Sequence, residues 1–201
     1  MDKRRFLTTA ALGAAAVPAF AQGPASRPGM PRGGMGGPTL LTLTGDIGRS
    51  NRGAFDPALD QLMGKHKLKF DKALAFDHRA LMALPTRTIE PTLEYDGKAH
   101  KLTGPALGAV LRAAGVTLQD KHRVLLRAID GYAPGLTAAD VARLNPIVAT
   151  HIDGRPMPLG GLGPLWCVHD ADRIPELAAK PLGERFALCP WGLYHIEIAQ
   201  A

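Results

Sequence analysis

The amino-acid sequence predicts an α+β domain that contains mixed β-sheets and a few short helices. Short apolar or alternating runs of strand length recur along the chain, and Gly, Pro, Asn or Asp residues separate them. The helical patterns are few, and they do not alternate with strands as a doubly wound fold requires. Of the 201 residues, 46% are hydrophobic and 21% are charged, a composition typical of globular proteins and unlike that of disordered chains.

Eight segments have the pattern of strands. The first alternates Thr and Leu and ends at Gly45, as a strand with two different faces does. Two later segments are followed by Asp96-Gly97 and Asp153-Gly154, which are typical of tight turns between antiparallel strands. The predicted strands are residues 39–45, 70–76, 86–95, 100–102, 124–129, 147–152, 164–168 and 193–198.

The clearest helical pattern lies between Thr103 and Gly115. Thr103 is the expected N-cap, Pro105 suits the first turn, and Gly115 is the expected end. The apolar positions are spaced at i, i+3, i+4 and i+7, so they form one stripe of the helix. They are Leu107, Val110, Leu111 and Ala114.

Two shorter helices are predicted from their caps. Asp77 is the expected N-cap of a helix over residues 78–84, which Pro85 ends. Thr137 and Asp140 have the spacing of a capping box, and Asn145 precedes the proline that ends that helix.

Residues 1–21 are predicted to be a signal peptide. Lys3-Arg4-Arg5 precedes an apolar run over residues 6–20, and Ala19-Phe20-Ala21 supplies the small residues of a cleavage site after Ala21. The order of the basic residues also resembles a twin-arginine signal with Lys in the first twin position, and ordinary secretion is the alternative. The apolar run is shorter than the ~20 residues that span a bilayer. We therefore expect a periplasmic protein with no stable membrane insertion, with an uncleaved anchor as the alternative.

Residues 22–38 are predicted to be a flexible linker. They contain six Gly and four Pro in seventeen positions and show no apolar periodicity. Met30 and Met35 in this stretch are potential soft-metal ligands, but a plain linker is the favoured interpretation.

The charge of the chain does not favour nucleic-acid binding. The formal net charge is +6, and it becomes +4 when residues 1–21 are removed. The densest basic patch, residues 65–69, contains no aromatic side chain that could stack on a base. We expect a solvated face there and no nucleic-acid partner.

The sequence predicts neither a metal site nor a serine nucleophile. The seven His residues are scattered, no two of them have the i, i+4 spacing of a helical zinc site, and no C-x-x-C occurs. Ser26 and Ser50 are the only serines, and neither lies in a G-x-S-x-G motif. Cys167 and Cys189 are candidates for a disulfide, because an exported protein meets an oxidising environment. A nucleophilic role for Cys167 beside His169 is the alternative.

Three loops at strand ends form the predicted binding site. They are residues 130–132, 153–158 and 160–166. Glycine lets backbone N–H groups approach an anion, Arg155 is suited to grip a phosphate, and Trp166 is suited to cover a flat ring. The expected ligand is therefore small and anionic, and ordinary turns beside a core Trp are the alternative. The predicted binding residues are Asp130, Gly131, Tyr132, Arg155, Gly163 and Trp166.

The order of several short motifs resembles the oxidoreductase molybdopterin-binding domain, the core fold of the sulfite oxidase family. The likeness is greatest to its short, exported, stand-alone members, and it extends over residues 39–201. It implies a sulfite-oxidase-type fold and a molybdopterin cofactor. The motifs are Thr103-Gly104-Pro105, Asp130-Gly131-Tyr132, the run from Asp153 to Pro158, Gly163-Pro164-Leu165-Trp166, Trp191-Gly192-Leu193 and Ile196-Glu197-Ile198.

One departure from that family limits the activity that the resemblance implies. The full enzymes hold molybdenum through a cysteine thiolate in the strand before the Pro105 helix, and residues 88–94 contain no Cys here. Glu90 is a hard ligand and a poor substitute for a thiolate. The leading hypotheses are a molybdopterin-dependent oxidoreductase with an altered metal shell and a non-catalytic periplasmic ligand-binding or accessory protein of the same fold. A structural domain tethered near the membrane by residues 22–38 is a third alternative.

Overall fold

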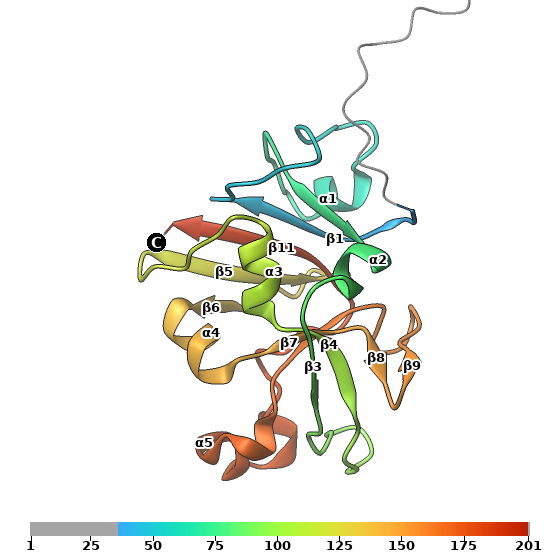
Figure 1. Ribbon diagram of the computed structural model, residues 1–201, viewed down its shortest axis with the longest axis vertical. Coiled ribbons are helices and arrows are strands. Elements are labelled where there is room, and N and C mark those ends of the chain that lie inside the picture. The colour runs from blue at the N-terminus through green and yellow to red at the C-terminus, as the bar shows by residue number, and fades with distance from the viewer. Residues whose placement is uncertain (1–35, 201) are drawn as a thin grey trace, which may run out of the picture. The chain divides into compact units, whose positions relative to one another are not determined.

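The principal sheet is assembled around the strand that comes last in the described chain. Its five strands are β1 (Thr39–Gly45), β2 (Leu74–Asp77), β5 (His122–Ala128), β6 (Gly135–Thr137) and β11 (Leu193–Gln200). The computed structural model describes residues 36–200, and in it the strand order is β2-β1-β11-β5-β6 (Figure 1). β11 is parallel to β1 and antiparallel to β5, so the sheet is mixed, as the sequence predicts.

Two smaller antiparallel sheets lie beside the principal one. Their strands are β3 (Thr86–Ile89), β4 (Leu102–Pro105), β7 (Ile147–Ala149), β8 (His151–Ile152), β9 (Arg155–Pro156) and β10 (Trp166–Val168). One sheet has the order β3-β4-β8-β9, and the other pairs β10 with β7.

The helices are short, which confirms the predicted α+β class. The α-helices are α1 (Gln61–Lys65), α2 (His78–Met82), α3 (Leu107–Ala113), α4 (Ala138–Leu144) and α5 (Pro175–Ala178). Single 3₁₀ turns occur at Ala171–Arg173 and Leu182–Glu184. Within residues 36–200, each helix is too short or too polar to cross a lipid bilayer.

Two clusters of buried side chains form the core. In the larger one, the apolar stripe of α3 packs against the inward face of the principal sheet, which includes Leu43, Leu126 and Ile196. The smaller one surrounds Trp166 and includes Phe186 and Cys189. Successive side chains of β10 point to opposite faces of the strand. Trp166 and Val168 therefore belong to the smaller cluster and Cys167 to the larger.

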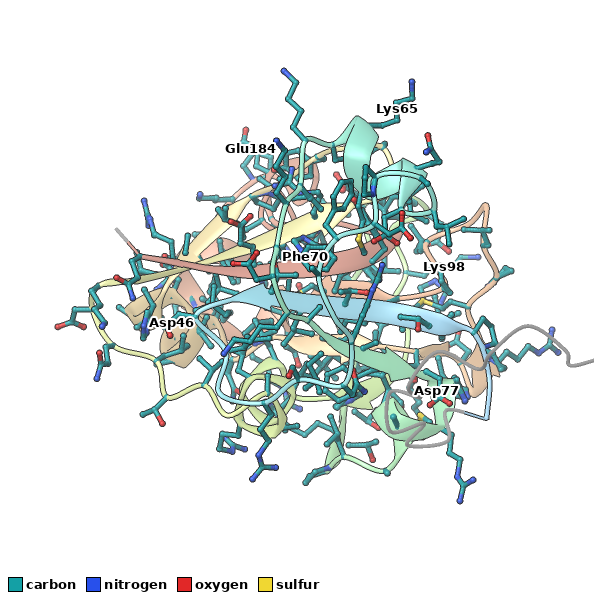
Figure 2. The ribbon with its side chains drawn as sticks, turned by 90° about the horizontal axis from the view of Figure 1, so that it is seen from above. Asp46, Lys65, Phe70, Asp77, Lys98 and Glu184 are labelled. Carbon is teal, nitrogen blue, oxygen red and sulfur yellow. The ribbon has the colours of Figure 1, made fainter. Side chains whose placement is uncertain are left out.

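The opposite face of the principal sheet is more polar and partly buried, and Thr42, Thr44 and His195 are among its buried side chains. The segment over residues 46–73, which includes α1, crosses this face (Figure 2), and His66 Nδ1 in that segment lies 2.6 Å from Tyr194 Oη. Beneath it, His195 Nε2 lies 2.9 Å from Thr44 Oγ1, and the His195 side chain is fully buried. Burial, followed by the positive charge of Arg127, lowers the pKa of His195 to about 3.

Several predicted caps are confirmed. Asp77 Oδ1 accepts the Ala80 N–H at 2.7 Å at the start of α2. Thr137 and Asp140 form the predicted capping box of α4, with the Asp140 N–H donating to Thr137 Oγ1 at 3.0 Å. Gly115 follows α3 with a φ of +73°, a backbone conformation that glycine adopts without strain.

The predicted start of α3 is wrong. Thr103 and Pro105 belong to β4, and Ala106 is the N-cap, with no side-chain hydrogen bond. Gly104 explains why the strand continues this far: a Cβ atom there would lie 2.0 Å from the Val148 carbonyl oxygen. The backbones of β4 and β7 therefore approach so closely that pairing of β4 prevails over the capping preference of Thr103.

Other boundaries also differ from the prediction. The strand predicted over residues 147–152 is two strands, because β7 pairs with β10 while β8 pairs with β4. The strand predicted over residues 70–76 is reduced to β2. The predicted signal peptide and linker residues 22–35 lie outside the described residues, and the last linker residues are described: the Gly37 N–H donates to Asp77 Oδ2 at 3.2 Å.

Candidate functional site

A cleft of about 200 Å³ lies between the turn after β5, the turn over residues 93–98 and the segment before β11. Three aromatic side chains in its wall remain about half exposed: Tyr95 at 53%, Tyr132 at 49% and Trp191 at 43%. Glu94 and Asp130 add two carboxylates to the lining. We call this feature the aromatic cleft.

The turn after β5 positions Asp130 and Tyr132. The Ala128 N–H donates to the Tyr132 carbonyl at 2.8 Å, and the Tyr132 N–H donates to Asp130 Oδ1 at 2.9 Å. Gly131 closes the turn with a φ of +93°, which a residue with a Cβ adopts only with strain. The Tyr132 hydroxyl donates to the Ala187 carbonyl and so ties this turn to the opposite wall of the cleft.

A second tight turn positions Glu94 and Tyr95. The Leu93 N–H donates to the Lys98 carbonyl at 2.8 Å, which closes the turn. Burial of the phenol and the adjacent Glu94 carboxylate raise the pKa of Tyr95 to about 12. The Tyr95 ring also lies 6.3 Å, centroid to centroid, from the buried Trp166 ring, so the wall of the cleft rests on the smaller core cluster.

Trp191 is placed by the backbone on either side of it. It forms a bridge with Trp166, and the next residue, Gly192, accepts the Ile129 N–H at 3.0 Å. Gly192 has a φ of +61°, so the chain turns sharply as it enters β11. These contacts join the Trp191 turn to the end of β5 and place the indole opposite the Asp130 turn.

Cys189 lines the inner part of the cleft beside His169. Its Sγ lies 3.3 Å from His169 Nδ1, and His169 Nε2 lies 2.9 Å from the Arg185 carbonyl oxygen. Burial raises the pKa of the Cys189 thiol to about 12 and lowers the pKa of His169. The thiol therefore stays protonated at neutral pH, which makes it a poor nucleophile.

The structure brings together only part of the site predicted from the sequence. Asp130 and Tyr132 line the cleft, and Gly131 lies behind them against the His66 ring. Arg155 is exposed on β9 and is not part of the lining. The prediction placed Arg155 in the site because residues 130–132 and 153–158 each follow a predicted strand. Those strands, β5 and β8, belong to different sheets.

The role predicted for Trp166 is wrong, because its side chain is fully buried. The indole N–H donates to the Cys189 carbonyl at 2.9 Å, so the ring supports the cleft from behind and cannot cover a ligand. Gly163 is buried as well: a Cβ atom there would lie 2.4 Å from the Met157 carbonyl oxygen. The sequence predicts that the Gly163 backbone contacts an anion, but this backbone packs against Met157 instead.

Sequence reasoning missed Glu94, Tyr95, Cys189 and Trp191 as members of one site. Tyr95 carried the best signal, since an aromatic residue next to a predicted Asp-Gly turn is poorly placed to enter a core. Trp191 lies between Pro190 and Gly192, which also indicates a turn. Only the tertiary fold shows that these two turns meet the Asp130 turn.

The predicted disulfide is not present in the structure, where Cys167 and Cys189 are free, buried thiols. Cys167 packs in the larger core cluster and Cys189 in the smaller one. The alternation of side chains along β10 turns Cys167 away from the cluster that contains Cys189. The alternative role of Cys167 as a nucleophile is also disfavoured, because burial raises its pKa well above the usual range.

We expect no thiol to react rapidly in the folded protein and two to react after unfolding without reductant. Both sulfurs are buried and protonated, so a thiol-specific reagent meets a thiolate only when the fold opens. Titration with Ellman's reagent in buffer and in guanidinium checks this. The Cys167→Ala variant is the control and should show one thiol. A wild-type chain with no reactive thiol after unfolding would instead establish the disulfide.

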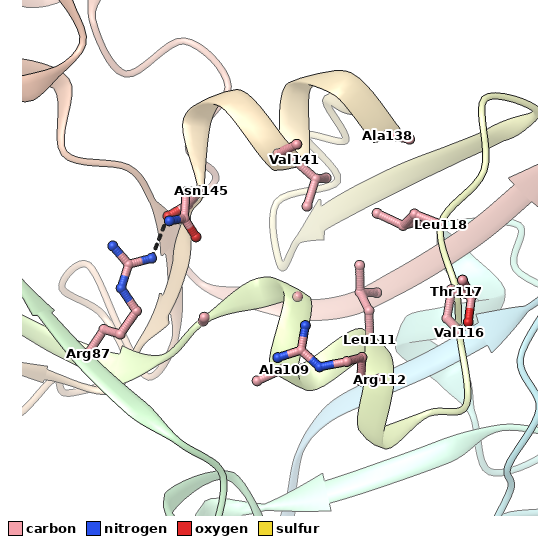
Figure 3. Close-up of a pocket in the computed structure, with 13 residues that line it drawn as sticks. Arg87, Ala109, Leu111, Arg112, Val116, Thr117, Leu118, Ala138, Val141 and Asn145 are labelled. Carbon is pink, nitrogen blue, oxygen red and sulfur yellow. Dashed lines mark hydrogen bonds between the residues drawn. The ribbon is translucent and has the colours of Figure 1, made fainter.

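A larger cavity lies elsewhere, in a groove of about 680 Å³ between α3 and α4 (Figure 3). Its floor is mostly apolar and includes Ala109, Leu111 and Val141. Arg87 lies at one end, where its guanidinium donates to the Asn145 carbonyl at 3.2 Å. Among the described residues that line it there is no carboxylate, thiol or imidazole, and so no acid–base pair. The aromatic cleft is therefore the better candidate for a functional site.

Comparison with known proteins adds no relative: no protein-family model and no curated protein matches this chain. Among residues 36–200, no three His, Cys, Asp or Glu side chains are grouped so that they could hold a metal ion. The function is therefore inferred from the geometry and charge of the cleft.

Proposed function

We propose that the protein is a non-catalytic, periplasmic ligand-binding protein of the sulfite-oxidase-type fold whose aromatic cleft binds a small organic cation. One observation carries this proposal. Tyr95, Tyr132 and Trp191 are exposed around one small cleft together with Glu94 and Asp130, and none of the described residues that line it is Lys or Arg.

Both kinds of side chain favour a positive charge. The faces of Trp and Tyr rings attract cations by about 0.5–2 kcal/mol each, depending on how far the cation is desolvated. Carboxylates at the rim attract the same charge and repel a phosphate. The ligand proposed here thus differs in sign from the anionic ligand expected from the sequence. The reason is that Arg155, the positive group of that expectation, does not line the cleft.

The residues present do not fit a molybdopterin cofactor. A pterin with a phosphate tail needs positive charge or free backbone N–H groups, and the cleft offers two carboxylates instead. The full enzymes of this family hold molybdenum through a cysteine thiolate in the strand before the Pro105 helix, and residues 88–94 contain no Cys. These observations support the non-catalytic hypothesis over the oxidoreductase. Location in the periplasm is part of the proposal and follows from the signal-like residues 1–21.

A calorimetric titration of the full-length chain with choline tests the ligand class. Its uncharged analogue, 3,3-dimethylbutanol, has nearly the same shape and serves as the matched ligand. We expect choline to bind at least tenfold more tightly than the alcohol, since about 1.4 kcal/mol of cation–π and carboxylate attraction depends on the charge. Trp191→Leu and Asp130→Asn should each weaken choline binding severalfold, whereas Asp71→Asn, at an exposed carboxylate outside the cleft, should not.

Two results would overturn the proposal. Equal binding of choline and the alcohol would show that the charge is not recognised. A stoichiometric pterin released on denaturation of natively expressed protein would establish the cofactor hypothesis instead.

A further inference from the structure

A second cluster of potential ligands lies outside the aromatic cleft, between α2 and β8. His78 and Met82 are four positions apart on α2, so they lie on the same side of the helix. His151 is the first residue of β8. The His78 side chain is exposed, and those of Met82 and His151 are half-buried.

The distance between the two imidazoles fits a shared metal ion. The ring centroids of His78 and His151 lie 5.8 Å apart, and the ring planes are tilted by 55°. A metal bound at about 2.0–2.1 Å by one nitrogen of each ring lies about 3.2 Å from each centroid, which places the centroids roughly 5–6.5 Å apart. The observed separation falls within that range without any movement of the backbone.

Thr150 orients both a histidine and the methionine. Its Oγ1 lies 2.8 Å from His151 Nδ1, and its hydroxyl proton is directed towards Met82 Sδ at 3.4 Å or the Thr103 carbonyl at 3.2 Å. When that proton is donated to either of these acceptors, His151 Nδ1 donates to Thr150 Oγ1. His151 Nε2 then keeps its lone pair, which is the state that a metal-binding imidazole requires.

We propose that His78, Met82 and His151 form a copper(I) site. Two imidazoles suit several metals, but a thioether selects a soft ion, and copper(I) accepts this donor set with a low coordination number. The nearest carboxylate on the same helix, Asp77, is occupied as the N-cap of α2 and accepts the Ala80 N–H. The ligands are therefore three neutral groups. The site is independent of the proposed function of the aromatic cleft.

The sequence analysis overlooked this site because it sought pairs of histidines and clusters of cysteines. His78 and His151 are far apart in the chain, and Met82 is a ligand only for soft metals. The i, i+4 spacing of His78 and Met82 was the available signal, and it becomes informative only when β8 places His151 beside α2.

Competition for copper(I) with the chromophoric chelator bicinchoninate tests the site in the full-length chain. Met30 and Met35 are replaced by Leu in every protein used, so that no thioether of residues 22–38 contributes. We expect one copper(I) per chain. His78→Ala and His151→Ala should each weaken binding at least a hundredfold. His100→Ala, which removes a partly exposed histidine elsewhere, should change it less than twofold.

Met82→Leu distinguishes copper(I) from a general imidazole site. It keeps the size of the side chain and should weaken copper(I) binding at least tenfold while zinc(II) binding changes less than twofold. X-ray absorption of the copper(I) form should show a Cu–S contribution that Met82→Leu removes. The proposal is overturned by copper(I) affinity that survives the His78→Ala/His151→Ala double change in a protein with the circular dichroism of the parent. A Cu–S signal that survives Met82→Leu would overturn it equally.

Discussion

Protonation of His195 is expected to remove about 4 kcal/mol of unfolding free energy as the pH falls from 6.5 to 3. The pKa of this histidine is about 3 in the fold and near 6.5 in an unfolded chain, so the unfolded state binds the proton first. A lowered histidine pKa gives stability that is complete above pH 6.5 and is lost as the pH falls towards 3. His195 Nδ1 has no hydrogen-bond partner among residues 36–200, so the fold offers no acceptor for a second ring proton.

Urea unfolding at intervals between pH 7 and pH 3 measures this loss. In His195→Asn the dependence of unfolding free energy on pH should be shallower than in wild type by up to one proton, about 1.4 kcal/mol per pH unit. His100→Asn is the control, because Asp153 and Asp96 raise the pKa of His100, so its contribution is lost as the pH rises. Parallel curves for wild type and His195→Asn would contradict the prediction.

Replacement of Gly104 by Ala is expected to lower the unfolding free energy by about 3 kcal/mol or more. The new Cβ would lie 2.0 Å from the Val148 carbonyl oxygen and 2.8 Å from Ala149 Cα, and both are backbone atoms that no rotamer change can move. β4 and β7 must therefore separate.

Gly108→Ala is the matched control for that substitution. Its Cβ would meet only the flexible end of the Arg112 side chain at 3.4 Å, and Ala is the better helix former within α3. Thermal unfolding should show a large loss of stability for Gly104→Ala and a neutral or stabilising effect for Gly108→Ala. Equal effects would show that the approach of β4 to β7 is not tight.

Local signals predicted the parts of the fold that local interactions determine. The Thr39–Gly45 strand has the predicted bounds, and the caps at Asp77 and Thr137 form as expected, because each depends on residues a few positions apart. Thr103 failed as a cap because the contact that decides its role, between Gly104 and Val148, is distant in sequence. The split of residues 147–152 has the same origin, since β7 and β8 pair with different strands.

The candidate site was predicted only where its residues are close in sequence. Asp130 and Tyr132 were found because they share one turn at a strand end. Trp166 was misplaced because exposure of a Trp depends on which sheet covers it, and in this fold it lies under Tyr95 and beside Phe186. Arg155 was also misplaced. Its Asp-Gly turn resembles the Asp130-Gly131 turn in sequence, but the two turns lie on different sheets.

The position of β11 has a consequence for the order of events during biosynthesis. Thr42 is the neighbour of His195 in the parallel pairing, so the principal sheet joins the earliest and latest strands of the described chain. A ribosome-bound chain from which β11 has not yet emerged has no central strand to hold β1 beside β5. Topologies with such distant pairings fold slowly and expose unpaired edges until they close. The principal sheet therefore cannot close until β11 has emerged from the ribosome, and until then the edges of β1 and β5 are open to a chaperone.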